Sequence, residues 1–340
     1  MTDRLPTESF AALRAGLTGF PGPDEAAMEA ARERQSQLTK PPGSLGMLEE
    51  LAIVLAGWQG RDKPIIHKAQ ALVFAGNHGV CAQGVNPFPQ EVTAQMVANF
   101  AHGGAAINQL CAANGCDLSV IALDLDRPTG DISQGPAMDE AETLDAMRQG
   151  AEAVDRAAQV LVLGEMGIGN STIAAALALA TFGGSGTDWA GPGTGADAEG
   201  VSLKARVVEQ AVQANRAALG DPLTTLAALG GREQAAICGA VLEARRRRIV
   251  VVLDGFICTA AAAPLHAIPG ALDHCIAGHV SAEPGHKRLL AALDKTPLLS
   301  LGMRLGEGSG AALAVSVLRS AVACHSGMAT FAEAGVAGGG

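Results

Sequence analysis

The chain has 340 residues, enough for one large α/β domain or two modest ones. Hydrophobic residues make up 48% of the sequence but aromatic residues only 3%, with no tyrosine, so the core must be built from Ala, Leu, Val and Ile. The net charge of −10 argues against a nucleic-acid partner, which requires a basic face and aromatic stacking positions. An anionic substrate would need a local Lys or Arg.

The seven cysteines form no CxxC pair and no zinc-ligand spacing, so we expect reduced core thiols and no bound metal. The first residues, Met1-Thr2-Asp3-Arg4, lack the apolar segment of a signal peptide. No run approaches the roughly 18 uncharged apolar residues that a membrane span requires. These features predict a protein of a bacterial-type cytoplasm that has no membrane partner.

Apolar residues recur with helical periodicity through residues 8–60, which predicts helices at the start of the chain. Short apolar runs then alternate with longer helical segments. The predicted strands are 71–74, 118–123, 160–163, 249–253 and 298–301, and the predicted crossover helices are 91–111, 138–157, 171–181, 203–218, 232–244 and 258–268. Continuous apolar strands are typical of a parallel sheet covered on both faces. The pattern predicts an α/β fold with a Rossmann-like, mostly parallel sheet flanked by helices.

The last helical segment, 311–323, and the tail through Phe331 are expected to pack against the N-terminal helices. We therefore predict a large Rossmann-like catalytic domain over residues 60–305 and a small helical domain built from both termini, residues 1–59 and 306–340. The most loop-like interior segment is 181–200, which contains two glycine clusters. A loop of this length inside a compact domain is usually functional or mobile.

One carboxylate stands among glycines in residues 304–310, Arg-Leu-Gly-Glu-Gly-Ser-Gly, between a predicted strand and an alanine-rich helix. Glycines on both sides of Glu307 permit positive φ and a close approach of the backbone. The C-terminal end of a strand that leads into a helix is where open α/β sheets hold ligands. The pattern alone leaves two interpretations open: a ligand-contacting carboxylate, or one that only complements the dipole of the following helix.

Two glycine-rich loops are candidate phosphate sites. Residues 164–172, Gly-Glu-Met-Gly-Ile-Gly-Asn-Ser-Thr, follow a predicted strand and open a helix, so their backbone N–H groups would point toward a ligand. The alternative is a tight turn capped by Asn170 or Ser171. The second loop, 191–195, precedes Lys204, which either supplies positive charge to a ligand or is simply solvated.

Three further features have no unique interpretation. His78 follows the first predicted strand and is either a general base or a structural histidine at a turn. Asp254, at the end of another predicted strand, would contact a ribose or orient a helix. The cluster Arg245 to Arg248 is more typical of a solvated run at a helix C-terminus than of an anion site.

Five motifs occur along the chain: Leu-Thr-Lys-Pro-Pro-Gly-Ser-Leu-Gly (38–46), Gly-Glu-Met-Gly (164–167), Leu-Asp-Gly-Phe (253–256), Ser-Ala-Glu-Pro-Gly (281–285) and the run 304–310. With these motifs in this order, the chain resembles the nicotinate-nucleotide–dimethylbenzimidazole phosphoribosyltransferase family from about residue 25 to 335. The resemblance implies that the 5-phosphoribosyl group of nicotinate mononucleotide is transferred to 5,6-dimethylbenzimidazole with inversion at C1′. The products would be nicotinate and α-ribazole 5′-phosphate, for the lower ligand of cobalamin. The resemblance also implies a homodimer that requires no metal or cofactor.

The resemblance assigns roles to individual residues of this chain. Glu307 matches the catalytic base, and Glu165 the second active-site carboxylate. The residues expected to bind substrate are Gly164, Gly167, Gly169, Asn170 and Ser171 on the nucleotide side, Lys204 at the phosphate, and Met303 and Leu305 at the benzimidazole. The chain departs from the family pattern at Phe88 and Met96, where relatives place polar Ser and Gln near the base. These two residues make the base pocket more apolar, or Gln95 takes the polar role.

Three other protein classes share parts of this pattern. A nicotinamide-dependent oxidoreductase would have the layered fold, but the glycine loops lack the dinucleotide spacing. A phosphoribosyltransferase that uses pyrophosphate-activated ribose would need a paired-acid magnesium motif at a strand end, which the sequence lacks. A non-catalytic nucleotide- or base-binding protein of the same fold is the remaining alternative, and the presence of both Glu165 and Glu307 argues against it.

Overall fold

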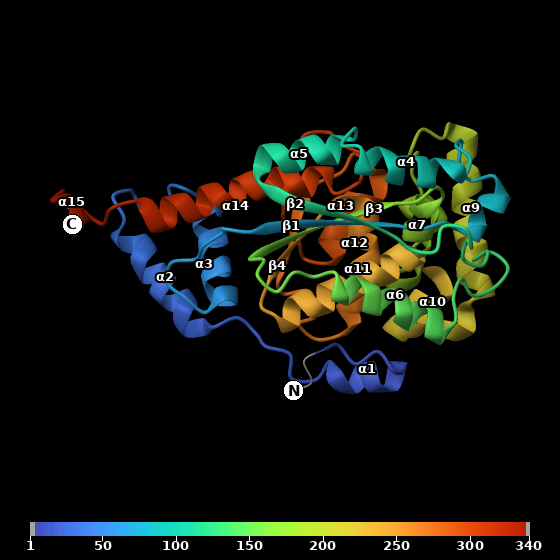
Figure 1. The fold of residues 1–340 in the computed structure, drawn as a ribbon, viewed down its shortest axis with the longest axis horizontal. Helices are drawn as coiled ribbons and strands as arrows, with labels where there is room; N and C mark the ends of the chain where they lie inside the picture. The colour runs from blue at the N-terminus through green and yellow to red at the C-terminus, as the bar shows by residue number, and fades with distance from the viewer. Residues whose placement is uncertain (1–3, 338–340) are drawn as a thin grey trace.

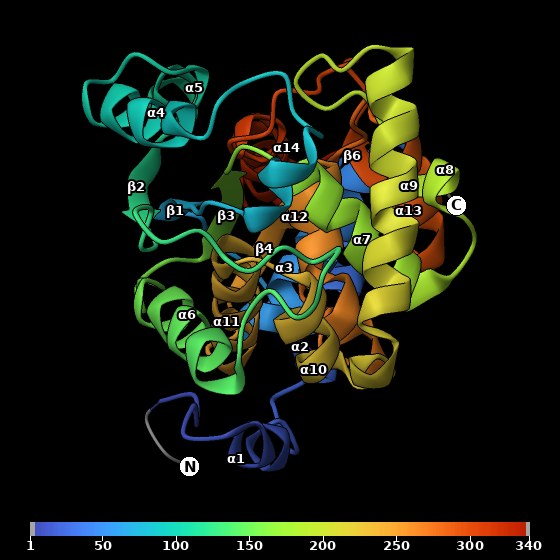
Figure 2. The same ribbon diagram turned by 90° about the vertical axis from the view of Figure 1, so that its right-hand side faces the viewer.

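The computed structural model describes residues 4–337 and contains a six-stranded sheet in which all neighbouring strands are parallel. The strands are β1 (Ala69–Ala75), β2 (Cys116–Ala122), β3 (Val160–Met166), β4 (Val250–Leu253), β5 (Cys275–His279) and β6 (Pro297–Leu299). Their order is β2-β1-β3-β4-β5-β6, so the chain moves from β1 to one edge and then returns past β1 to β3 (Figures 1 and 2). A reversal of this kind opens a crevice at the carboxyl ends of the strands.

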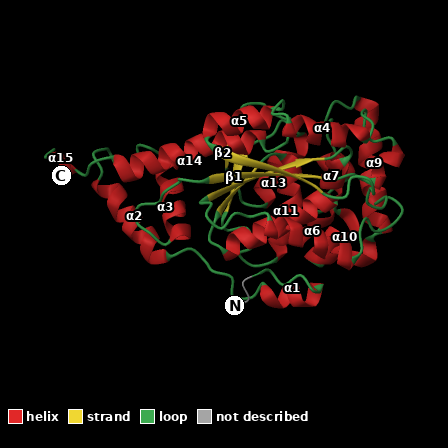
Figure 3. Cartoon of the chain, in the orientation of Figure 1, coloured by secondary structure: helices red, strands yellow, loops and turns green. Residues whose placement is uncertain are grey.

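Helices make up most of the remaining structure (Figure 3). They are α1 (Phe10–Gly16), α2 (Glu25–Gln37), α3 (Met47–Gln59), α4 (Glu91–Ala101), α5 (Ala106–Asn114), α6 (Glu140–Glu152), α7 (Asn170–Phe182), α8 (Gly186–Trp189), α9 (Ala198–Ala214), α10 (Pro222–Leu229), α11 (Arg232–Arg246), α12 (Phe256–Ala262), α13 (Pro284–Ala292), α14 (Ser309–Gly327) and α15 (Phe331–Ala334). Short 3-10 helices occupy Gly79–Gln83, Arg216–Ala218 and Ala263–Ala267.

The two faces of the sheet are buried by different helices. In β3, Leu161 and Leu163 belong to one apolar cluster, whereas Val160 and Val162 belong to the other, because side chains alternate along a strand. Helices α6, α7, α10, α11 and α12 contribute to the first cluster, and α3, α4, α5 and α14 to the second (Figure 1). The prediction of a parallel α/β sheet covered by helices on both faces is therefore confirmed, and the sheet is parallel throughout.

Helices α6 and α11 pack closely because each contributes a glycine to the contact. A Cβ atom at Gly239 of α11 would lie 1.9 Å from the carbonyl oxygen of Met147, and one at Gly150 of α6 would lie 1.9 Å from that of Ala236. No side chain can be accommodated at either position without moving a helix. The two glycines therefore set the separation of this helix pair on the sheet.

The N-terminal helices lie in two places (Figure 1). Helices α2 and α3 pack near the C-terminal end of α14, where the Arg34 Nε–H donates to the carbonyl oxygen of His325 at 2.8 Å. Helix α1 lies instead near α6 and α10, with Arg14 paired to Asp221 at 2.7 Å. The first turn of α14 reaches the sheet, because its Ala311 is a member of the second apolar cluster. The division at residues 59/60 and 305/306 stays a prediction, and its outermost residues, 1–3 and 338–340, lie outside the described part.

Three local predictions differ from the structure. Strand β5 was not predicted, because Cys-Ile-Ala-Gly-His is short and contains only one β-branched residue. The segment 91–111 is two helices instead of one, since Gly103, with φ +76, and Gly104 interrupt it. The predicted loop 181–200 contains the short helix α8, and its last residues already belong to α9.

Composition also led to expectations about cysteines and membranes. Each of the seven cysteines is a free thiol, and five of them, Cys111, Cys116, Cys238, Cys258 and Cys275, are buried. Within residues 4–337, no helix combines the length and the apolar character that crossing a membrane requires.

Candidate active site

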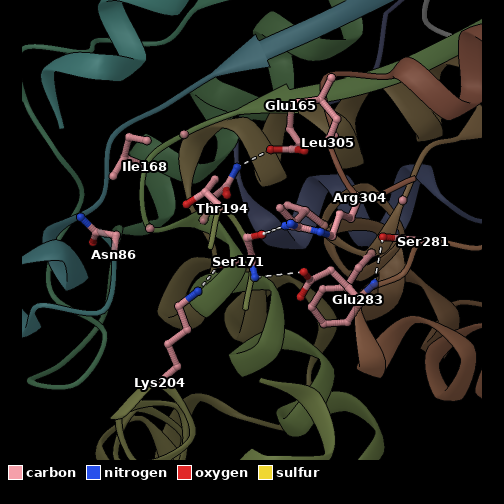
Figure 4. A pocket seen from close by; sticks show the side chains of 18 of the residues that line it. Asn86, Glu165, Ile168, Ser171, Thr194, Lys204, Ser281, Glu283, Arg304 and Leu305 are labelled. Carbon is pink, nitrogen blue, oxygen red and sulfur yellow. Dashed lines mark hydrogen bonds between the residues drawn. The ribbon is translucent and has the colours of Figure 1, made fainter. Parts of the chain in front are cut away.

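A pocket lies at the carboxyl ends of the strands (Figure 4). The loops that follow β3, β4, β5 and β6 all line it, together with Asn86 and the segment before α9. Its walls therefore come from chain segments more than 200 residues apart. This is the position at which open parallel sheets bind ligands.

The loop after β3 turns directly into α7. Gly169 has φ +92 and immediately precedes Asn170, the first residue of that helix. The N–H of Ile168 donates to Thr93 Oγ1 at 3.1 Å, which ties the loop to α4. A Cβ at Gly167 would lie 2.6 Å from the carbonyl oxygen of Gly76, so only glycine is accommodated there. The N-terminus of α7 thus borders the pocket, an arrangement that favours anions.

Glu165 is a buried carboxyl group in the pocket wall and is only 4% exposed. Its Oε2 accepts a hydrogen bond from Asn170 Nδ2 (Figure 4). Burial raises the pKa of Glu165 well above its usual range, and the charges of Asp254 and Glu233 raise it further. These effects favour the protonated form, in which the carboxyl group can donate as well as accept a hydrogen bond.

Glu307 lies in a turn of unusual backbone conformation just before α14. Gly306, Glu307 and Gly308 have φ values of +86°, +64° and +82°. The side chain is 7% exposed, and its Oε2 accepts no hydrogen bond from the described residues. Burial, and secondarily the charge of Asp254, raises the pKa of Glu307 to about 7. A carboxyl group with such a pKa changes its protonation state near neutral pH, as a general base must.

A second wall of the pocket carries positive charge. Lys204, only 3% exposed, donates from Nζ to Ser171 Oγ at 3.1 Å and to the carbonyl oxygen of Gly191 at 3.4 Å. Burial lowers the pKa of Lys204, and the nearby Glu283 opposes that shift. Arg304 reaches the same region and donates to the carbonyl oxygen of Gly193 at 2.9 Å (Figure 4). Two cations and a helix N-terminus therefore face one part of the pocket.

Glu283 organises the glycine loop on this side. Its Oε1 accepts a hydrogen bond from the N–H of Gly193 at 2.9 Å. A Cβ at Gly191 would lie 2.1 Å from Glu283 Oε2, so the loop passes the carboxyl group closely. Burial raises the pKa of Glu283, while the Gly193 hydrogen bond, Lys204 and Arg304 lower it. Glu283 therefore holds the loop against the cationic wall.

His78 and Glu233 form a buried pair under the loop that follows β3. His78 Nε2 lies 2.7 Å from Glu233 Oε1, and both side chains are fully buried. Neither residue lines the pocket. This placement favours the interpretation of His78 as a structural histidine over that of a general base.

The structure brings about half of the predicted site residues to the pocket. Those that line it are Glu165, Gly167, Gly169, Asn170, Ser171, Lys204 and Leu305. Gly164 and Glu307 lie just outside, where a Cβ at Gly164 would approach the backbone carbon of Glu307 to 2.5 Å. Met303, Phe88, Gln95 and Met96 do not line the pocket; Phe88 and Gln95 are exposed. The roles assigned to all these residues stay predictions.

Several pocket residues were not predicted from the sequence. They are Asn86, His279, Ser281, Glu283 and Arg304, with the backbone of Gly255. Glu283 and Ser281 belong to the motif 281–285, and Arg304 opens the run 304–310, so the motifs contained them without indicating a contact. His279 ends β5, the strand that was not predicted, and no sequence signal pointed to it.

The parallel sheet and the pocket define an α/β protein whose ligand site has an acidic and a cationic side. A family model described as phosphoribosyltransferase matches residues 20–336. The nicotinate-nucleotide–dimethylbenzimidazole phosphoribosyltransferase of Jannaschia sp. (strain CCS1) is 61% identical over 328 residues, 96% of this chain and 97% of that protein. The protein of the same name from Rhodobacter capsulatus is 60% identical over 333 residues, 98% of this chain and 99% of that protein.

A solved structure has the same fold. The crystal structure of CobT from Thermus thermophilus superimposes with a TM-score of 0.87 at 43% sequence identity, covering 92% of this chain and all of that one. The chain therefore belongs to the nicotinate-nucleotide–dimethylbenzimidazole phosphoribosyltransferase family.

Proposed function

We propose that the protein transfers the 5-phosphoribosyl group of nicotinate mononucleotide to 5,6-dimethylbenzimidazole or a related base. A nitrogen of the incoming ring bonds to C1′ as the bond between C1′ and the nicotinate nitrogen breaks. The electron pair of the broken bond neutralises the pyridinium ring, which leaves as nicotinate. The donor has the β configuration and the product, α-ribazole 5′-phosphate, the α configuration, so a single displacement with inversion accounts for the reaction. The product serves the lower ligand of cobalamin.

Glu307 is the base in this mechanism. Once one imidazole nitrogen bonds to C1′, the N–H of the other becomes strongly acidic and its proton passes to a carboxylate. The observation that carries the proposal is the buried Glu307 carboxyl group, which has an unpaired Oε2 and a pKa raised to about 7 beside the pocket. The leaving pyridinium needs no proton, so one base on the acceptor side is sufficient.

The two walls of the pocket support opposite ends of the nucleotide. Lys204, Ser171 and the N-terminus of α7 suit the 5′-phosphate, since they supply a cation, a hydroxyl group and backbone N–H donors. Glu165 suits the ribose, because a buried, protonated carboxyl group can both donate and accept hydrogen bonds with hydroxyl groups, and its oxygens place partial negative charge near C1′. Gly164, Gly167, Gly169 and Asn170 shape this side, and Met303 and Leu305 offer apolar surface to the benzimidazole.

Further parts of the proposal concern the whole molecule. The helices over both faces of the parallel sheet support the Rossmann-like description of residues 60–305, and the packing of α2 and α3 near the end of α14 supports a small helical part built from both termini. We infer a cytoplasmic homodimer. This inference is carried over from the family resemblance. Light scattering of the purified protein measures the oligomeric state.

A direct assay tests the reaction. The purified protein is mixed with nicotinate mononucleotide and, separately, with a panel of benzimidazoles and purines, and products are identified by mass spectrometry. We expect equal amounts of nicotinate and α-ribazole 5′-phosphate with 5,6-dimethylbenzimidazole. Binding of both substrates without product formation would instead support the alternative, a non-catalytic nucleotide- or base-binding protein. The panel also shows whether this protein, with its Phe88, Gln95 and Met96, prefers a base other than 5,6-dimethylbenzimidazole.

A further inference from the structure

Asp254 is a fully buried carboxyl group at the end of β4 that contacts the helix following Glu307. Its Oδ1 accepts a hydrogen bond from the N–H of Ala311 at 2.9 Å, and its Oδ2 accepts one from the N–H of Gly308 at 3.2 Å. Gly308 is the N-cap of α14, and Ala311 lies in its first turn. The first N–H groups of a helix have no partner within the helix. Asp254 supplies that partner from another strand and uses both of its oxygens to do so.

The turn that Asp254 contacts is conformationally unfavourable. Three consecutive residues, 306–308, have positive φ, and the middle one, Glu307, is not a glycine. A side chain in the left-handed region costs free energy, and such a conformation persists only where surrounding contacts determine it. The N–H of Ser309 donates to the carbonyl oxygen of Gly306 at 3.0 Å within the turn, and the side chain of Asp254 bonds the backbone of the turn from outside.

We propose that Asp254 is a positioning residue for Glu307: its carboxylate fixes the turn 306–308 at the head of α14, so that the carboxyl group of Glu307 is held beside the pocket. The inference rests on the proposed function of Glu307 as the base. It adds the group that places that base, and it gives Asp254 a helix-orienting role instead of contact with a ribose.

The charge of Asp254 acts on the same carboxyl group. The groups that face Asp254 are His279 of β5, with Nε2 at 3.5 Å from Oδ1, Glu165 of β3, Glu307 of the turn, and the thiol of Cys258 in α12. Burial raises the pKa of Asp254, while His279 and the backbone N–H groups oppose that shift. After burial, the charge of Asp254 is the other cause that raises the pKa of Glu307. Position and charge are therefore expected to change together when Asp254 is replaced.

The substitution Asp254→Asn tests the inference because it preserves volume, removes the charge, and leaves one oxygen for two N–H donors. We expect kcat to fall about 10- to 100-fold, the effect of a displacement of roughly 1 Å at a reacting group, with KM for nicotinate mononucleotide unchanged. The acid limb of kcat/KM for the base is expected to move to lower pH, since the charge that raises the pKa of Glu307 is lost. The matched control is Asp139→Asn, which removes the N-cap carboxylate of α6, bonded to the N–H of Glu142 at 2.8 Å and outside the pocket.

A double-mutant cycle separates positioning from a general structural role. If Asp254 acts through Glu307, Asp254→Asn causes no further loss of kcat in a Glu307→Gln background. A full, multiplicative loss in that background would overturn the inference. So would a folded Asp254→Asn protein with the kcat and acid limb of the wild type, even if its unfolding temperature is lower.

A second variant covers the case in which Asp254→Asn does not fold. Gly308→Ala retains Asp254 but places a Cβ on a residue with φ +82 and 3.3 Å from Gly164 Cα, which disturbs the same turn. We expect a fall in kcat with nucleotide affinity retained, and an unchanged kcat would contradict the inference. The wild-type protein in the same assay separates the role of Asp254 from the proposed function. If the wild type forms product and the variants have normal kcat, only the role of Asp254 is overturned. If the wild type forms no product, the proposed function is overturned as well.

Discussion

Replacing Glu307 with glutamine should abolish most turnover and at the same time stabilise the fold. Glutamine has the same shape but cannot accept a proton, so kcat should fall about 10²- to 10⁴-fold, the usual contribution of a general base. A pKa raised from 4.5 to about 7 means that the ionised carboxyl group of Glu307 lowers the free energy of unfolding of the protein. At about 1.4 kcal/mol per pKa unit the cost is at most about 3.5 kcal/mol. Partial solvation at the pocket edge reduces it to about 1 to 2 kcal/mol.

The sign of this stability effect follows from proton binding. Between pH 4.5 and about 7 the folded state binds more protons at Glu307 than the unfolded state, so the free energy of unfolding falls as the pH rises through this range. Glu307→Gln removes this decrease in the free energy of unfolding. Urea unfolding of both proteins at pH 4.5 and pH 8 measures the effect. At pH 4.5 we expect similar free energies of unfolding, apart from any pH-independent effect of the amide, and at pH 8 we expect a higher value for the variant.

The assay for turnover is nicotinate release at saturating substrates, with nucleotide binding measured separately by calorimetry. Glu50→Gln, in the first turn of α3 and exposed, is the control and should leave turnover and stability nearly unchanged. Wild-type kcat in a purified, folded Glu307→Gln protein would refute the assignment of the base. Equal stability of the two proteins at pH 8, with none of the expected gain, would refute the account of the raised pKa.

Three further predictions concern other parts of the molecule. In the wild type, kcat/KM for the base should rise with pH to a plateau with an apparent pKa near 7, because only ionised Glu307 accepts a proton; a flat profile between pH 5.5 and 8.5 would contradict this. Lys204→Ala should raise KM for nicotinate mononucleotide by about 10- to 100-fold, as loss of a charge-assisted hydrogen bond would, but not KM for the base. The exposed Lys287→Ala is its control, and equal losses for both substrates would argue against a phosphate contact. Gly239→Ala should lower the free energy of unfolding by about 1 to 3 kcal/mol, because the added Cβ overpacks α6 against α11. Gly135→Ala is its control and should change the free energy of unfolding little, since no atom lies within 4 Å of the added Cβ. Thermal unfolding compares the two variants.

The sequence predicted the layered architecture well because its strands carry strong local signals. The runs 71–74 of β1 and 160–163 of β3 are continuously apolar, and each is followed within a few residues by glycines, so the presence of both strands is visible in the residues themselves. Strand β5 has no such signal: Cys-Ile-Ala-Gly-His is stabilised by its place between β4 and β6. Tertiary context decides such a segment, and local propensity does not.

The candidate site was predictable where one motif contains both the chemistry and its geometry. The glycine loop around Glu165 places a carboxyl group at the end of β3, and the run around Glu307 places one in the turn before α14; both lie at or next to the pocket. The contact of Glu283 with Gly193 could not be predicted, because it joins residues 90 apart. The same is true of Asp254, whose two hydrogen bonds to the head of α14 depend on the relative positions of β4 and that helix.

Helix α14 connects the turn that carries the proposed base to the far end of the molecule. It has 19 residues and therefore a length of about 28 Å, from Gly308 beside the sheet to the region where α2 and α3 pack. If the helix tilts as a rigid body by about two degrees about its C-terminal end, the turn at its N-terminal end moves by about 1 Å. Displacements of that size at a reacting group change rates by up to about 10²-fold. Contacts as remote as that of Arg34 with His325 are therefore expected to influence turnover, although neither residue lines the pocket.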